Sequence, residues 1–551
     1  MSKTIDPGAP ASKRIWPMLA WLVILGVVTA IRVRLLNMPL ERDEGEYAYA
    51  GQLLLQGISP YQGAYDIALK LPGTCGAYAL IMAVFGQTAA ALRAGVILVN
   101  LASAGLVFVL ARRIYGEAGA VVASGTYALL SIVPETFGLA AHATHFVMLP
   151  ALAGIVLLQN LDNHTRSARI FLAGLFIGLA IMMKQTGAAF GLFAAGWVAH
   201  YEIASGQKAW RRLAVRLGWL ALGGVLPLAL TCVGIVCAGD FGRFWLWTVE
   251  FAGAHATIIS FGTEIKTMTG VVIALFKAAP GLWSLAILGF LLVWGEPSLR
   301  RWRFFVVGFV IFSWVASWPG WRGHYFIQLL PATGLLAGAA FCALSAVLAR
   351  LKLSFSPAAI APLVFAVALA SPLIQWSDIY FQLAPAQASR AVYGLNPFPE
   401  SVEIGRYLAT HCPPEDRIAV LGSEPQIYFY GRRRSATGYT CTYPLMEPQP
   451  YALEMQQEMI RQIENARPEY VVFVHVSASW LQYRDSTTLI LDWFGHYQRE
   501  HLQLVGLVEI WPRAPTQYHW FEPPATNVQT TAEDWLAIFK RRADGAKPEG
   551  N

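Results

Sequence analysis

The chain has 551 residues, of which 56% are hydrophobic and only 14% are charged. A soluble domain carries about 25% charged residues, so this composition excludes a disordered chain, a coiled coil and most cytosolic enzymes. The net charge is +7, but no basic run with interleaved aromatic residues predicts a nucleic-acid partner. The composition therefore indicates a polytopic α-helical membrane protein.

The first apolar run, residues 15–36, follows basic residues and is interpreted as an uncleaved span with a cytoplasmic N-terminus. With the runs that follow before residue 376, we expect about 11 transmembrane helices in a membrane domain of residues 1–375. In this topology every cytoplasmic loop contains two or more Lys or Arg residues, as the positive-inside rule requires. The pattern predicts a multi-pass protein of the inner (plasma) membrane. The later predicted spans are 90–111, 118–134, 146–161, 169–184, 187–201, 217–238, 269–294, 303–318, 325–349 and 357–375.

The first outer loop, residues 37–89, has the most distinctive pattern. It begins with ERDEGE at residues 41–46, four acids and an arginine just beyond the first span. The stretch ending at Gly57 and the stretch 72–86 are predicted to be helices at the outer interface, because counting 72–86 as a span would spoil the pattern of basic loops. A solvated loop would explain the acids. The alternative is that an acid and a lysine at the membrane surface serve a charged, lipid-linked substrate.

Residues 376–551 have a net negative charge and are predicted to form a small α/β domain. Because the number of spans is odd, this domain is expected outside the cytoplasm, in the periplasm or extracellular space. The predicted strands are 416–422, 469–476 and 502–512, with a helix at 450–466. The polar end, from about Pro515 onward, is predicted to be loosely ordered.

Two features of this domain have alternative interpretations. Cys412 and Cys441 could form a disulfide in an extracytoplasmic domain, or could pack as separate thiols. The run Arg432-Arg433-Arg434 is explained by a surface turn, or by contact with an anionic acceptor or with lipid headgroups. No Cys-x-x-Cys pair occurs, which argues against a cysteine zinc site.

The order of these motifs resembles the GT-C glycosyltransferases, and family 39 in particular, which includes the protein O-mannosyltransferases and the lipid A aminoarabinose transferase. The resemblance extends over about residues 15–475. It depends on the acids after the first span, the Lys-x-Pro motif at 70–72, and the stretches GLFIGLAIMMKQTG (174–187), WRGHYFIQLLPATGLLAG (321–338) and GSEPQIYFYGRRRSATGY (422–439).

The resemblance implies transfer of a sugar from a polyprenyl-phosphate donor to an acceptor hydroxyl on the outer face of the membrane, usually with inversion. Such a reaction needs a carboxylate base for the acceptor proton and cations for the leaving phosphate. By resemblance Asp43 is the base, Glu44 supports it and Lys70 contacts the donor phosphate. Arg322, His324 and Tyr325 are further candidates for the lipid phosphate, although an interfacial anchor cluster explains them equally well.

Four other residues are candidate substrate contacts: Tyr61, His142, His145 and Lys184. Where family relatives carry an acid or Asn in the outer loop after the third span, this chain has His142 and His145 instead, which puts a two-carboxylate site in doubt. These histidines bind substrate, share a divalent metal, or simply end a span. Lys184 contacts substrate or extends its amine to the interface as a span end.

The alternatives to a glycosyltransferase are a polytopic transporter and a non-catalytic protein of cell-envelope assembly. A transporter should show internal repeats and broken midplane helices, and the sequence shows neither. The expected partners are a polyprenyl-phosphate-linked sugar, membrane lipids, and a lipid, glycan or protein acceptor.

Overall fold

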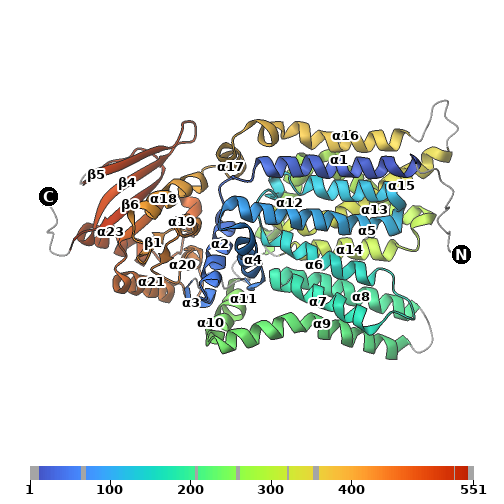
Figure 1. Ribbon diagram of the computed structural model, residues 1–551, viewed down its shortest axis with the longest axis horizontal. Helices are drawn as coiled ribbons and strands as arrows, with labels where there is room; N and C mark the ends of the chain where they lie inside the picture. Colours follow the sequence, from blue (N-terminus) through green and yellow to red (C-terminus); the bar gives the residue numbers. More distant parts are fainter. Residues whose placement is uncertain are drawn as a thin grey trace. The chain divides into compact units, whose positions relative to one another are not determined.

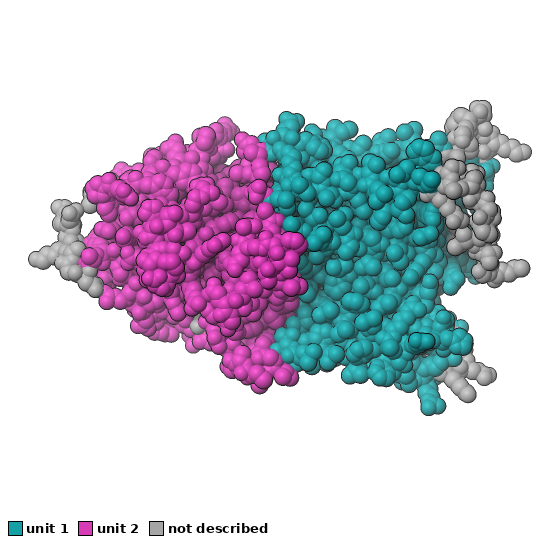
Figure 2. Space-filling model, viewed as in Figure 1, with its two compact units in different colours: residues 1–36, 93–231, 261–383 teal, residues 37–92, 232–260, 384–551 magenta. Residues whose placement is uncertain are grey.

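The computed structural model describes residues 12–63, 70–204, 209–255, 261–318, 322–350, 359–525 and 528–543. It is 71% helical and divides into two compact units (Figure 2). Unit 1 contains residues 1–36, 93–231 and 261–383, and unit 2 contains residues 37–92, 232–260 and 384–551. The first outer loop therefore belongs with the C-terminal domain in space, which differs from the predicted linear division at residue 376.

Unit 1 is a bundle of helices (Figure 1). Its helices are α1 (Ser12–Arg34), α5 (Ala89–Leu130), α6 (Ala143–Leu158), α7 (Ser167–Met183), α8 (Ala188–Ala204), α9 (Ala209–Cys237), α12 (Phe261–Ala278), α13 (Pro280–Gly295), α14 (Arg303–Ala316), α15 (Leu330–Arg350) and α16 (Ile360–Gln375), where α5 begins and α9 ends in unit 2. Short helical turns connect them: η2 (Pro134–Thr136), η3 (Gln185–Gly187), η5 (Pro297–Leu299), η6 (Gly323–Gln328) and η8 (Asp378–Gln382).

Within the described residues, four helices are long and apolar enough to cross a membrane: α1, α5, α9 and α15. A fifth candidate is the pair α12 and α13, which is bent by 110°. Shorter apolar helices, α6, α7, α14 and α16 among them, accompany these in unit 1. The predicted helical membrane fold is confirmed, whereas the total of about 11 spans stays a prediction.

Helix α5 is a hairpin rather than one rod of 42 residues. Gly116 interrupts it with a φ of 76°, a conformation that favours glycine. The Ser124 hydroxyl donates to the Ala104 carbonyl oxygen at 2.7 Å, although these residues would lie about 30 Å apart along a straight helix. The chain therefore reverses near Gly116, in agreement with two predicted spans, 90–111 and 118–134.

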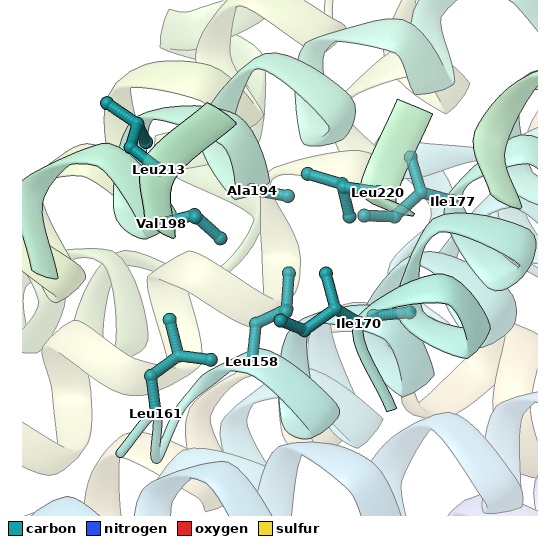
Figure 3. Packing of buried hydrophobic residues seen from close by; sticks show 9 residues of the cluster. Leu158, Leu161, Ile170, Ile177, Ala194, Val198, Leu213 and Leu220 are labelled. Atoms are coloured by element: carbon teal, nitrogen blue, oxygen red, sulfur yellow. The ribbon is translucent and has the colours of Figure 1, made fainter. Parts of the chain in front are cut away.

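Helices α6 to α9 pack around a cluster of aliphatic side chains, shown in Figure 3. Its members are Leu158, Leu161, Ile170, Ala173, Ile177, Ala194, Val198, Leu213 and Leu220. Small residues let the helix backbones approach: a Cβ on Gly174 would lie only 2.1 Å from the Leu220 carbonyl oxygen. Packing through small residues is typical of helices that associate in lipid, where burial of apolar surface gives no driving force.

Three of the predicted cytoplasmic loops meet within unit 1. Arg113 donates to the Val156 carbonyl oxygen at 3.0 Å, and Arg169 donates to that of Leu157 at 2.7 Å. Arg216 donates to the Asp162 carbonyl oxygen at 2.5 Å. The basic loops that contain Arg113, Arg169 and Arg216 thus gather at one end of the bundle, as alternating spans require. Which end faces the cytoplasm stays a prediction.

Unit 2 contains a six-stranded sheet with the order β2-β1-β3-β6-β4-β5. The strands are β1 (Arg417–Leu421), β2 (Arg434–Ser435), β3 (Tyr470–His475), β4 (Leu502–Ile510), β5 (Gln517–Ala525) and β6 (Asp534–Arg541). Strand β1 is parallel to β2 and β3, whereas β6 is antiparallel to β3 and β4. The three predicted strands and the predicted helix, α21 (Ala452–Ala466), are confirmed.

The described residues after Pro515 differ from the predicted loosely ordered end, because they include two strands, β5 and β6. Strand β5 lies at the sheet edge, and β6 lies inside the sheet with Leu536, Ala537 and Ile538 buried. The apolar core of β6 is short and has charged neighbours, so its own sequence gives a weak strand signal. Its backbone groups are instead satisfied by β3 and β4, which are distant in sequence.

The remaining helices of unit 2 come from all three of its segments. They are α2 (Arg42–Leu55), α3 (Pro60–Gly63), α4 (Gly73–Phe85), α10 (Phe241–Trp245), η4 (Leu246–Phe251), α11 (Ala252–His255), α17 (Pro385–Tyr393), α18 (Phe398–His411), α19 (Gln426–Gly431), α20 (Tyr443–Met446), α22 (Ser477–Trp480) and α23 (Leu489–His501). Helices α2 and α4 confirm the two helices predicted in the first outer loop. Cys412 and Cys441 are both buried and no disulfide joins them, so of the two alternatives the structure shows separately packed cysteines.

Candidate functional site

The acidic stretch after the first span forms the start of α2. The Glu41 carboxylate accepts from the Glu44 backbone N–H at 2.8 Å, and the Glu44 carboxylate accepts from the Glu41 N–H at 3.0 Å. This reciprocal capping satisfies N–H groups that the first helical turn leaves free, and acids here also suit the helix dipole. Glu44, a predicted site residue, is fully buried in this cap, so it fixes the helix start that carries Asp43.

Asp43 and Lys70, which the sequence predicted as base and phosphate contact, lie together in unit 2. The Lys70 ammonium is 3.0 Å from a carboxylate oxygen of Asp43 and 2.6 Å from one of Glu46. It also lies 4.5 Å from the centre of the Tyr47 ring. Glu46 was not predicted as a site residue, although its i, i+3 spacing from Asp43 places both on one helix face. We call Asp43, Glu46 and Lys70 the α2 triad.

The two carboxylates of the α2 triad differ in their access to solvent. The Asp43 side chain is 33% exposed and the Glu46 side chain is 7% exposed. Burial raises the pKa of Glu46, and it outweighs the opposing effect of Lys70. Burial alone would lower the pKa of Lys70, but Asp43 and Glu46 raise it well above its usual value. Lys70 is therefore a protonated cation, and Asp43 is the more exposed of its two carboxylate partners.

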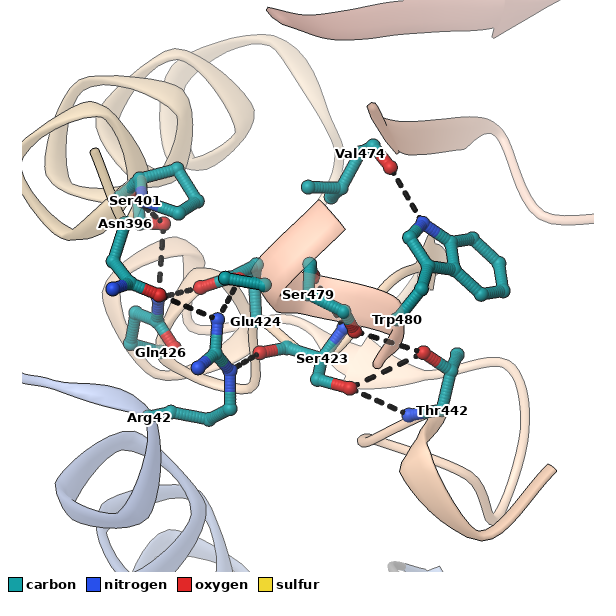
Figure 4. Close-up of polar contacts among 12 residues, drawn as sticks. Arg42, Asn396, Ser401, Ser423, Glu424, Gln426, Thr442, Val474, Ser479 and Trp480 are labelled. Carbon is teal, nitrogen blue, oxygen red and sulfur yellow. Dashed lines mark hydrogen bonds and ion pairs between the residues drawn. The ribbon is translucent and has the colours of Figure 1, made fainter. Parts of the chain in front are cut away.

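Arg42 joins the start of α2 to the C-terminal domain within unit 2 (Figure 4). Its guanidinium lies 2.6 Å from the fully buried carboxylate of Glu424, and it also donates to the Ser423 carbonyl oxygen. A further bond at 3.2 Å reaches the Asn396 side-chain oxygen. The Gln426 amide in turn donates to Glu424 at 2.5 Å. The sequence stretch containing Glu424 was part of the family resemblance, but nothing in it indicated Arg42 as the partner.

Helix α2 also touches α19 closely at Gly45. A Cβ on Gly45 would lie 2.6 Å from the backbone nitrogen of Gln426. Gly45→Ala is therefore expected to push α2 away from α19 and to lower the free energy of unfolding by about 1–3 kcal/mol, a common cost of overpacking. Thermal unfolding of the detergent-solubilised protein measures it.

Gly495→Ala is the matched control for this prediction. Gly495 lies inside α23 of the same unit, and a Cβ there would meet nothing within 4 Å. Alanine is the better helix former, so the control should raise stability slightly. Equal effects of the two substitutions would contradict the close contact between α2 and α19.

A second group of predicted residues comes together in unit 1. The rings of His142 and His324 are stacked, with centroids 4.1 Å apart and planes 9° apart. The His324 ring packs edge-on against Tyr325 at 4.6 Å, and the Lys184 ammonium lies 3.3 Å from the centre of the Tyr325 ring. Three predicted outer loops thus meet here. We call His142, Lys184, His324 and Tyr325 the histidine cluster. Arg322 is exposed next to it, at the start of η6.

Two further predicted contacts occupy packed positions. His145 is fully buried, with its Nε2 3.0 Å from the Gly138 carbonyl oxygen. The structure thus pairs His142 with His324 rather than with His145, its predicted partner in sharing a metal. Tyr61, in unit 2, is 2% exposed and packs edge-on against Phe244 at 5.4 Å. The roles of these residues in substrate binding stay predictions, as does participation of a divalent metal.

Comparison with solved structures defines the class of the fold. ArnT from Cupriavidus metallidurans bound to undecaprenyl phosphate matches with a TM-score of 0.54 and 17% identity, over 85% of this chain and 94% of ArnT. Its apo state matches with a TM-score of 0.52 and 19% identity, over 84% and 93%. The oligosaccharyltransferase AglB from Archaeoglobus fulgidus, with an inhibitory peptide and a dolichol-phosphate, has a TM-score of 0.52 and 14% identity, over 95% and 76%. The chain therefore has the GT-C fold of a multi-pass membrane protein.

A family model matches a shorter part of the chain. Residues 75–235 match the model of the dolichyl-phosphate-mannose-protein mannosyltransferases, and no curated protein matches the chain. The predicted resemblance to GT-C enzymes of family 39 is confirmed. The matched residues include His142 and Lys184 but begin after Asp43 and Lys70. The α2 triad is thus an observation independent of the family match.

Proposed function

We propose that the protein is a membrane glycosyltransferase that moves a sugar from a polyprenyl-phosphate donor to an acceptor hydroxyl. The proposal rests above all on the α2 triad, where an accessible carboxylate and a fixed cation lie 3.0 Å apart in a chain with the GT-C fold. The reaction needs both groups: a base for the acceptor proton and a cation for the phosphate. The fold and the family match support the lipid-linked donor.

In the proposed reaction the acceptor oxygen attacks the anomeric carbon as its proton passes to Asp43. The bond between the anomeric carbon and the phosphate oxygen breaks, and the polyprenyl phosphate leaves with the electron pair. Because this is a single displacement, the anomeric configuration inverts. Lys70 faces the charge that develops on the phosphate, in a partly buried place where such an interaction is stronger than in water.

The contact between Lys70 and Asp43 also suggests how the base is made available. The Lys70 ammonium, 3.0 Å from a carboxylate oxygen of Asp43, occupies an oxygen that the acceptor hydroxyl would otherwise approach. A donor phosphate competes with Asp43 for Lys70, because phosphate carries more charge and more acceptor oxygens. Binding of the donor therefore frees Asp43 for the acceptor proton. Glu46 keeps Lys70 in place during this exchange.

The histidine cluster and Arg322 are proposed as further donor contacts. Lys184 and Arg322 are two cations of this part of unit 1, and guanidinium geometry suits phosphate oxygens. We place the N-terminus in the cytoplasm and the C-terminal domain on the outer side of the inner membrane, which agrees with the basic loops that gather at one end of unit 1. A lipid, glycan or protein supplies the acceptor hydroxyl.

The test begins with a strain that lacks this protein. Mass spectrometry of its glycolipids and glycoproteins, compared with the parent strain, should find a class of glycan that loses one sugar. Expression of the wild-type chain should restore that sugar. If neither glycolipids nor glycoproteins change, the proposed transfer is wrong.

Lys70→Ala is expected to raise the KM for the donor about 10- to 100-fold, because the donor phosphate loses one hydrogen bond to a charged group. Acceptor KM should change little, because Lys70 faces the phosphate in the proposed reaction. Initial rates of polyprenyl-phosphate release, with each substrate varied in turn, separate the two constants. Lys540→Ala is a matched control, since Lys540 lies 3.7 Å from Glu469 in the same unit. A change confined to acceptor KM would contradict the assignment.

A further inference from the structure

A second polar site lies in unit 2, at the end of α2 remote from Asp43. It is a cavity of about 370 Å³, lined by Gln56, Pro414, Glu415, Arg417, Arg432 and Arg434. Gln56 caps the C-terminal end of α2, 13 residues after Asp43. At 1.5 Å per residue this separation is about 20 Å. The cavity is therefore distinct from the α2 triad.

The charge of this cavity is unbalanced. Three arginines line it against one acid, and all four side chains are exposed. Arg434 donates to the Gln56 side-chain oxygen at 3.1 Å, but within the described part of the chain none of the three arginines forms an ion pair. In the described structure, therefore, no carboxylate neutralises the positive charge of these three arginines.

The sheet brings two of these arginines into direct register. Arg417 of β1 and Arg434 of β2 are partners on neighbouring parallel strands. Like charges in such positions repel and destabilise a sheet. An anion between the two guanidinium groups would relieve this repulsion.

The neighbouring Arg433 provides a contrast. It is 6% exposed, and its guanidinium donates to the carbonyl oxygens of Cys412 and Ala409, the latter at 3.0 Å. The run of three arginines is thus divided: Arg433 holds the backbone together inside the domain, whereas Arg432 and Arg434 line the cavity. Arg432 ends α19 in a left-handed turn, which explains its exposure, whereas Arg434 lies on strand β2.

We propose that this cavity, which we call the arginine pocket, binds a phosphate group. Guanidinium groups match phosphate oxygens with paired N–H donors. A phosphate carries about two charges and three acceptor oxygens, which suits three arginines better than a carboxylate with one charge. The phosphate belongs either to a lipid headgroup or to a water-soluble phosphorylated molecule. The proposal does not depend on sugar transfer.

Calorimetric titration of the full chain in an uncharged detergent tests the pocket with two probes. Inorganic pyrophosphate represents a soluble phosphate, and dihexanoyl phosphatidic acid represents a lipid headgroup, with dihexanoyl phosphatidylcholine as its neutral comparison. The double variant Arg417→Ala/Arg434→Ala should bind the effective probe about tenfold more weakly or worse. Arg417→Lys/Arg434→Lys should recover only part of the affinity, because lysine lacks the paired donors. Arg484→Ala, an exposed arginine outside the pocket, is the matched control.

The outcomes separate the two sources of phosphate. Loss of pyrophosphate binding in the alanine variant supports a soluble ligand, and loss confined to phosphatidic acid supports a lipid headgroup. The unliganded alanine variant should melt no lower than wild type, since the substitution removes a repulsion. Wild-type protein that binds neither probe, or a variant that binds both as wild type does, would overturn the proposal.

Discussion

Asp43→Asn is expected to reduce sugar transfer about 10²–10⁴-fold, the usual contribution of a general base. Asparagine has nearly the shape of aspartate, but its amide does not accept the acceptor proton. The side chain lies in the first turn of α2, and the capping bonds between Glu41 and Glu44 do not involve it. The helix should therefore form normally. The measurement is the sugar restored to the missing glycan when the variant is expressed in the deletion strain.

The control for this experiment is Asp485→Asn, an exposed acid of unit 2 outside the α2 triad. It should restore the glycan as wild type does. Membrane expression and thermal unfolding of both variants should match wild type, so that lost transfer is not lost folding. Near wild-type transfer by Asp43→Asn would show that Asp43 is not the base. A transporter or an assembly protein also predicts no loss, so the same result would favour those functions.

Arg42→Ala is expected to lower the free energy of unfolding by about 3–5 kcal/mol, because it leaves the Glu424 carboxylate buried without its cation. The Arg42 side chain is 13% exposed and that of Glu424 is 0% exposed, so water screens the pair little. Transfer should fall as well in the protein that remains folded, since Arg42 holds the turn that carries Asp43. Thermal unfolding and the rate per folded molecule measure the two effects.

Arg406→Ala is the control for the Arg42 substitution. Arg406 forms an ion pair with Glu403, but its side chain is 65% exposed, so its loss should change stability little. Arg42→Lys should recover part of the stability but less of the transfer, because an ammonium does not reproduce the bonds to Ser423 and Asn396. If Arg42→Ala and Arg406→Ala lower the free energy of unfolding equally, the buried pair of Arg42 and Glu424 does not stabilise the domain as expected.

Several features of this protein follow from local sequence alone. The apolar runs and basic loops predict a helical membrane domain. Each charged residue placed in lipid costs free energy by itself, so the spans can be recognised from local sequence. Helices α2 and α4 and strands β1, β3 and β4 were predicted within a few residues, since each has its own apolar pattern and stop signals. Asp43 and Lys70 were recognised by resemblance to a family.

Other features were decided only by tertiary contacts. Strand β6 depends on β3 and β4, and Arg42 depends on Glu424, 382 residues later in the chain. Cys412 and Cys441 pack separately, although the sequence was also compatible with a disulfide between them. The arginine pocket arises because β1 and β2 are neighbours in the sheet. Local patterns determine which segments are helix, strand or span, because those preferences act over a few residues. The partners of buried charges and of strands such as β6 depend on the whole fold. The free energy of burying a charge or a strand depends on which partner is buried with it.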